Sequence, residues 1–151
     1  MFRRQTLIAA FGTIALVMVA PFAAAQQAAA PAADKWQSVA KTDTQEAFVN
    51  ASSITVVGAL LEARVKQNFV QPMPSTKKDK TYLSSRTTFR FDCAQRRVAM
   101  KEIRTYPGSD LQGDSISKAT SSDKYLQWLD AAPDTVYGDV LDYVCKSAPA
   151  G

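Results

Sequence analysis

Two cysteines constrain the fold of this 151-residue chain more than any other feature. Cys93 and Cys145 lie 52 positions apart, both in the part of the chain that follows a leader of the secretory type. Exported proteins fold in oxidising compartments, where paired cysteines persist as disulfides. A redox-active pair is usually a close Cys-X-X-Cys, so this wide spacing favours a structural bridge. We expect the bridge to join the end of a strand to the end of the last helix.

The first 25 residues have the three parts of a bacterial secretory signal. Arg3 and Arg4 form a basic start, residues 7–20 are apolar, and residues 23–25 are the three alanines of a small-residue cleavage site. The apolar run is shorter than the about 20 residues that a membrane-spanning helix needs, so we expect cleavage. Export by the general or the twin-arginine route then places the protein in the periplasm or outside the cell.

Composition divides the rest of the chain into three parts. Residues 26–33 are rich in Ala, Gln and Pro and lack a hydrophobic face, which predicts a disordered lead-in. Residues 34–146 have the length of one domain, and residues 147–151 are expected to form a disordered tail. Residues 34–104 hold 13 Lys or Arg against seven Asp or Glu, whereas residues 105–151 hold three against seven. This imbalance predicts a basic sheet face, unless the cations are ordinary solvated residues.

The spacing of hydrophobic residues predicts an α+β domain. Alternation is clearest over residues 59–70, where Leu61, Ala63 and Val65 share one side, and over residues 81–93, which end with Phe89 and Phe91. Shorter runs raise the total to about six antiparallel strands in a meander. These shorter runs are residues 35–41, 46–50, 97–106 and 114–119.

After Pro133 the hydrophobic period changes to that of a helix. Asp134 or Thr135 is the expected N-cap, and the apolar residues that follow are Val136, Tyr137, Val140, Leu141 and Val144. We expect this helix, together with the segment around Trp128, to cover one face of the sheet. Trp36 and Trp128 are expected to anchor the core, with ligand stacking as the alternative.

The residue types present exclude several kinds of catalysis. The chain has no histidine, so it has neither a Ser-His-Asp nor a Cys-His nucleophile pair. Two cysteines alone do not complete a structural zinc site. We therefore expect no catalytic residues, no metal and no cofactor. An enzyme of unrecognised type would need a cluster of convergent carboxylates with shifted pKa values.

Basic side chains on the predicted strands form a candidate binding surface. They are Arg64, Lys66, Arg86, Arg90, Arg97, Lys101 and Arg104. Such a surface favours a protein or anionic polymer partner bound with marked salt dependence. Nucleic acid is disfavoured, because no aromatic-rich basic motif accompanies these residues. The alternative function is a periplasmic small-ligand carrier, whose apolar pocket between sheet and helix would be lined by Leu83, Phe89, Trp128 and Tyr137.

The order of short motifs over residues 34–146 resembles the surface-adhesin E family of proteobacterial exported proteins. These motifs are Trp36, the segment AFVNASSI at residues 47–54, Gly58, a strand containing Ser84 that runs to Phe91-Asp92-Cys93, a basic return strand, Trp128, Pro133 and Cys145. Asn50 stands where the family often has Asp, and Asp134-Thr135 where a Ser often follows the Pro. The resemblance implies a curved antiparallel sheet with a C-terminal helix tied to its concave face by the disulfide. It also implies no enzymatic activity and adhesion to host extracellular-matrix proteins.

Overall fold

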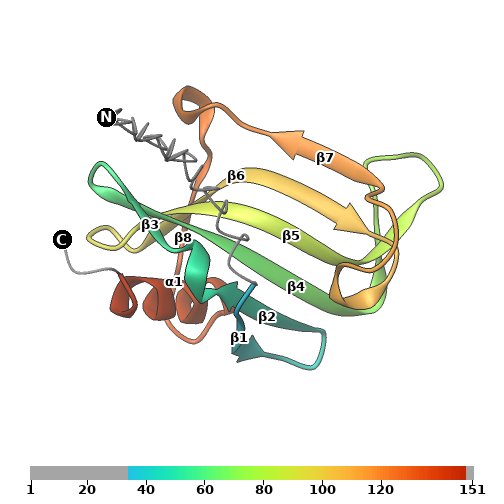
Figure 1. The fold of residues 1–151 in the computed structure, drawn as a ribbon, viewed down its shortest axis with the longest axis horizontal. Coiled ribbons are helices and arrows are strands. Elements are labelled where there is room, and N and C mark those ends of the chain that lie inside the picture. Colours follow the sequence, from blue (N-terminus) through green and yellow to red (C-terminus); the bar gives the residue numbers. More distant parts are fainter. Residues whose placement is uncertain (1–33, 149–151) are drawn as a thin grey trace, which may run out of the picture. The chain divides into compact units, whose positions relative to one another are not determined.

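Strands of alternating buried and exposed side chains build one twisted, curved antiparallel sheet (Figure 1). The computed structural model describes residues 34–148, so the predicted leader, the lead-in and the end of the tail lie outside the described residues. The strands are β1 (Trp36–Lys41), β2 (Gln45–Asn50), β3 (Thr55–Val57), β4 (Leu60–Pro74), β5 (Thr81–Asp92), β6 (Arg97–Tyr106), β7 (Ser117–Thr120) and β8 (Trp128–Asp130). One α-helix follows them in this part of the chain, α1 (Val136–Lys146).

The sheet is a meander with two short additions. Its order is β1-β2-β4-β5-β6-β7, while β3 pairs with β4 and β8 pairs with β6. The predicted α+β class is confirmed, but the described residues form eight strands where the sequence predicts about six. The difference is β3 and β8, which have three residues each and pair along the ends of longer strands. Runs this short have no clear period of their own.

The helix covers one face of the sheet and closes the hydrophobic core. Val65 and Phe91 from the strands, and Val140 and Val144 from α1, are each at most 1% exposed. Their burial removes apolar surface from water and is the main stabilising term for this layer pair. Thr135 is the N-cap, since its side chain accepts a hydrogen bond from the Gly138 N–H at 3.1 Å.

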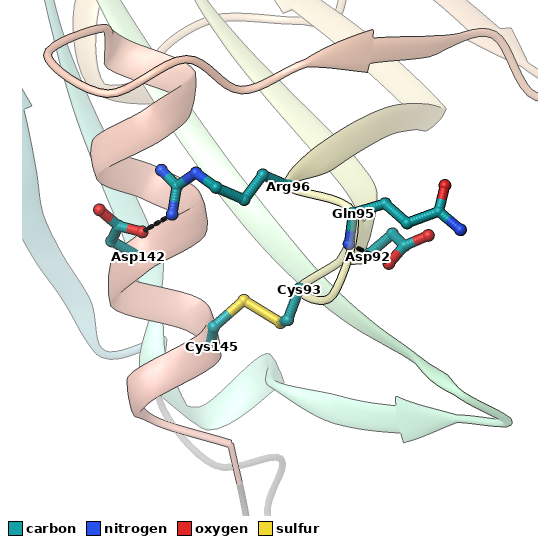
Figure 2. Close-up of a disulfide and its surroundings, with 6 residues drawn as sticks. All are labelled: Asp92, Cys93, Gln95, Arg96, Asp142 and Cys145. Atoms are coloured by element: carbon teal, nitrogen blue, oxygen red, sulfur yellow. Dashed lines mark hydrogen bonds and ion pairs between the residues drawn. A yellow bond between two sulfur atoms is a disulfide. The ribbon is translucent and has the colours of Figure 1, made fainter.

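The predicted disulfide is confirmed (Figure 2). Cys93 lies in the turn after β5, Cys145 lies in the last turn of α1, and their Cα atoms are 5.9 Å apart. Beside the bridge, Arg96 Nη1 donates to Asp142 Oδ1 at 2.7 Å, a second link between the β5–β6 turn and α1. This hydrogen bond and the nearby Arg96 charge lower the pKa of Asp142.

The expectation that both tryptophans anchor the core is wrong. A bulge at Val39 shifts the register of β1, so Ala40 faces the core and Trp36 faces the other side. Trp128 pairs with Ala99 in the sheet, and its ring lies 5.2 Å from the Arg97 guanidinium. The segment around Trp128 therefore extends the sheet and does not cover the core.

Candidate binding face

All seven predicted cations lie on the face of the sheet that points away from α1, called here the polar face. The alternation that buries Val65 and Phe89 against the helix turns Lys66 and Arg90 to this side. A bulge in β6 at Lys101 also turns Glu102 and Arg104 to the polar face, where Lys101 and Arg90 share Asp123 as an ion-pair partner.

Register places four cations directly side by side. Lys66 on β4 pairs with Arg86 on β5, Arg86 with Arg104 on β6, and Arg104 with Lys118 on β7. We call these four residues the basic row. Neighbouring strands lie about 4.8 Å apart, and like charges directly opposite each other destabilise a sheet. A row of this kind therefore needs anions nearby.

Two carboxylates compensate part of the positive charge of the basic row. Lys66 Nζ donates to Asp110 Oδ1 at 2.6 Å. Glu102 accepts from Arg104 Nε at 3.0 Å and pairs with Lys118 Nζ at 3.1 Å. These contacts hold the pKa of both carboxyls below the usual range, through Lys66 for Asp110 and through Arg104 for Glu102. Two anions thus serve three of the four cations.

Arg86 is the cation that these carboxylates leave out. It is half-buried, and within residues 34–148 its guanidinium has neither an ion-pair partner nor a hydrogen-bond partner. Its direct neighbours across the strands are Lys66 and Arg104, both positive. The middle of the basic row therefore carries an uncompensated charge.

Lys66 is mainly a structural residue and contributes little to the accessible surface. Only 8% of it is exposed, and its Nζ lies 4.2 Å from the centre of the Phe48 ring and 5.4 Å from that of Trp36. Cation–π contacts of this kind, together with the Asp110 carboxylate, compensate the buried ammonium. Trp36, placed on this face by the bulge in β1, thus covers Lys66.

The Asp110 carboxylate reaches Lys66 from the β6–β7 loop (residues 107–116). Asp110 and Leu111 have φ angles of 54° and 63°, a left-handed conformation that costs residues other than glycine free energy. Hydrogen bonds to β4 and β5 hold them there: the Asp110 N–H donates to Asn68 Oδ1 and the Leu111 N–H to Ser84 Oγ, both at 2.9 Å. The loop is thus fastened to the polar face beside Arg86.

Replacing Asp110 by Asn is expected to lower the free energy of unfolding by about 1–2 kcal/mol, because it leaves the buried Lys66 ammonium unpaired. The loss is smaller than for a fully buried pair, since the Asp110 side chain is 59% exposed and solvent screens it. Urea unfolding at neutral pH measures the change. The same substitution at Asp114, in the same loop but outside the ion pairs of the described residues, is the control and should have no comparable effect.

The stability difference at Asp110 should depend on pH with a defined sign. Because the pKa of this carboxyl is lowered in the folded protein, its contribution is complete above the unfolded pKa of about 4. It is lost as the pH falls through the lowered folded pKa. Wild type and Asp110→Asn should therefore converge in stability at acidic pH, and a difference that persists there would contradict the ion pair.

The remaining predicted cations have local partners. Arg90 is 8% exposed and lies 2.7 Å from Glu62 and 3.4 Å from Asp123. Arg64 pairs with Asp34 and Arg97 with Asp92, each at 3.2 Å. Of the seven predicted cations, Arg86 is therefore the one without a carboxylate partner among the described residues, and its neighbours Arg104 and Lys118 share a single carboxylate, that of Glu102. The predicted set omits Lys118, because cross-strand register cannot be read from the sequence.

The alternative pocket between sheet and helix is filled by the protein's own side chains. Phe89 is 2% exposed and its ring centre lies 5.7 Å from that of Tyr137, while Leu141 is 1% exposed. Burial raises the pKa of Tyr137. Trp128, expected in the lining, lies on the polar face. Residues 34–148 contain no group of three metal-ligating side chains and no helix with the length and apolarity needed to cross a membrane.

Comparison with known proteins gives one family and one fold. The family described as surface-adhesin protein E matches residues 36–146. A solved structure of Haemophilus influenzae protein E superimposes with a TM-score of 0.53 at 16% identity, covering 74% of this chain and 83% of that chain. Another, from non-typeable Haemophilus influenzae, gives 0.51 at 17% identity over 78% and 81%. At these identities the structural similarity demonstrates a shared fold. No curated protein matches the sequence significantly.

Proposed function

This chain belongs to the surface-adhesin protein E family, and from that membership we propose that it is an exported, non-enzymatic, adhesin-like module that binds an anionic protein or polymer through the basic row. The disulfide supports export, because such a bridge persists in the periplasm or outside the cell. The leader at residues 1–25 would direct that export and be removed.

The observation that carries the proposal is Arg86, which has no ion-pair or hydrogen-bond partner among residues 34–148. A guanidinium presents five N–H donors in a planar fork that fits carboxylate and sulfate oxygens two at a time. Arg86 is half-buried and has a positive neighbour on each side, so an anion placed there relieves repulsion as well as gaining hydrogen bonds. Arg90 is the less informative residue, since its two carboxylate partners already satisfy its charge.

Replacing Arg86 by Ala is expected to weaken binding to an anionic surface by about tenfold, the equivalent of one charge-assisted hydrogen-bonded contact. The measurement compares retention of the exported protein on immobilised heparin, poly-glutamate and uncharged dextran at low and physiological salt. The melting temperature should stay close to wild type, because Arg86 has no partner to lose among the described residues.

Lys146→Ala is the matched control, since it removes one positive charge from the exposed end of α1, on the helix side of the sheet. It should leave binding unchanged. An equal loss of binding in Lys146→Ala and Arg86→Ala would show that net charge, and not the position of Arg86, determines the binding. Equal retention of the wild type on dextran and on heparin would refute anion binding altogether.

A further inference from the structure

Building on the proposed function, we infer that the ligand is a sulfated polysaccharide that crosses the strands along Arg86, Arg104 and Lys118, and that Glu102 sets its affinity by competing for two of these cations. Arg86, Arg104 and Lys118 are direct cross-strand partners on the successive strands β5, β6 and β7. Their backbone positions therefore follow one another across the strands at a spacing of about 4.8 Å.

A narrow line of cations suits a linear polyanion better than a folded protein. A stable protein interface needs about 800 Å² per partner with few charged residues at its centre. The surroundings of the basic row are instead highly charged, because Arg64, Arg90 and Lys101 lie beside it, each in an ion pair. A flexible chain of sulfates needs only the line itself.

The basic row is covered at its Lys66 end and accessible at its Lys118 end. At Lys66 the Asp110 carboxylate and the rings of Trp36 and Phe48 occupy the space above the ammonium. At the other end, β7 is the last strand in the order of the sheet, and the Lys118 side chain is 49% exposed. A polymer that is bound at Arg86 and crosses the strands therefore runs over Arg104 and Lys118 and leaves across β7.

Glu102 is the internal anion that such a polymer meets. Its two carboxylate oxygens contact Arg104 Nε and Lys118 Nζ separately, so one residue engages both cations that follow Arg86. A sulfate approaching these cations must displace the carboxylate and is repelled by it. Replacing Glu102 by Gln keeps the shape of the side chain but removes that charge.

The test measures binding of size-defined heparin oligosaccharides, and of fully desulfated heparin, to the exported protein. Glu102→Gln is expected to strengthen binding about three- to tenfold and to steepen its salt dependence, because two cations become free for sulfate. Lys118→Ala should weaken binding of long oligosaccharides more than of short ones. Desulfated heparin should not bind. Asp139→Asn, the same charge change on the exposed side of α1, is the control and should alter neither affinity nor salt dependence.

The outcomes separate this inference from the proposed function. Suppose that Arg86→Ala weakens binding to poly-glutamate while Glu102→Gln and Lys118→Ala leave heparin binding unchanged. The proposed binding of a polysaccharide across the strands is then wrong, and anion binding at Arg86 stands. If Glu102→Gln strengthens binding no more than Asp139→Asn does, the role of Glu102 is also wrong. If Arg86→Ala changes binding to no anion, both proposals fail. Lys118→Ala, at an exposed edge position, keeps the test valid should Glu102→Gln reduce folding.

Discussion

Replacing Cys93 by Ser should lower the free energy of unfolding by about 4 kcal/mol, the largest loss we expect from a single side chain. The bridge closes a loop of 52 residues, and the chain-entropy relation for a loop of this length gives that figure. Cys93 itself is exposed, so serine there buries no new polar group. For a domain of this size the melting temperature should fall by about 15 °C or more.

The measurement is urea and thermal unfolding of the exported protein with and without a reductant. Reduction should destabilise the wild type by the same amount as the substitution and leave Cys93→Ser unaffected. Cys145→Ser and the double variant should match Cys93→Ser, because both residues act through one bond. Titratable thiols in the untreated wild type, or a wild type indifferent to reductant, would contradict the bridge.

The disulfide was predictable because the chain offers only one pairing. The two long strands and the helix were predictable for a different reason: one face of each must be apolar. Leu61, Ala63 and Val65 alternate along β4, and the 3.6-residue period begins after the Thr135 cap. Burial imposes these periods locally, so they can be read from the residues alone.

The candidate site was predictable only in part, because it depends on register and on contacts distant in sequence. Alternation indicates that Lys66 and Arg86 face away from the core, but not that they lie opposite each other, and Arg104 reaches the same face only through the bulge in β6. Asp110 meets Lys66 across 44 positions of sequence, through a loop whose left-handed residues no local pattern indicates. These contacts decide which cations are buried and which stay accessible to a ligand, so the sequence alone does not separate the two groups.

Bulges account for the remaining errors. The one in β1 turns Trp36 from the core to the polar face, and the one in β6 breaks the alternation expected for residues 97–106. A bulge adds one residue to a strand and reverses the side of every residue beyond it. Neither bulge contains a glycine that would have indicated it.

Replacing Gly138 by Ala is expected to cost about 3 kcal/mol, although helix propensity alone favours alanine by about 1 kcal/mol. Gly138 lies in the first turn of α1 and is buried. A Cβ at this position would overlap the carbonyl oxygen of Ala132, a backbone atom that cannot rotate away. That carbonyl also accepts the Thr135 hydroxyl at 2.7 Å, so moving it weakens the N-cap.

The sign of the change tests the packing of α1, because propensity and overlap predict opposite results. Asp139→Ala, on the exposed side of the same turn, is the control and should change stability by no more than about 0.5 kcal/mol. The overlap is relieved if the helix shifts on the sheet, and the Cys93–Cys145 bridge opposes that shift at the far end of α1. The cost of Gly138→Ala should therefore be smaller in a Cys93→Ser background than in the wild type. A Gly138→Ala variant more stable than wild type would show that the segment at Ala132 yields, and that the helix is held less tightly than its contacts indicate.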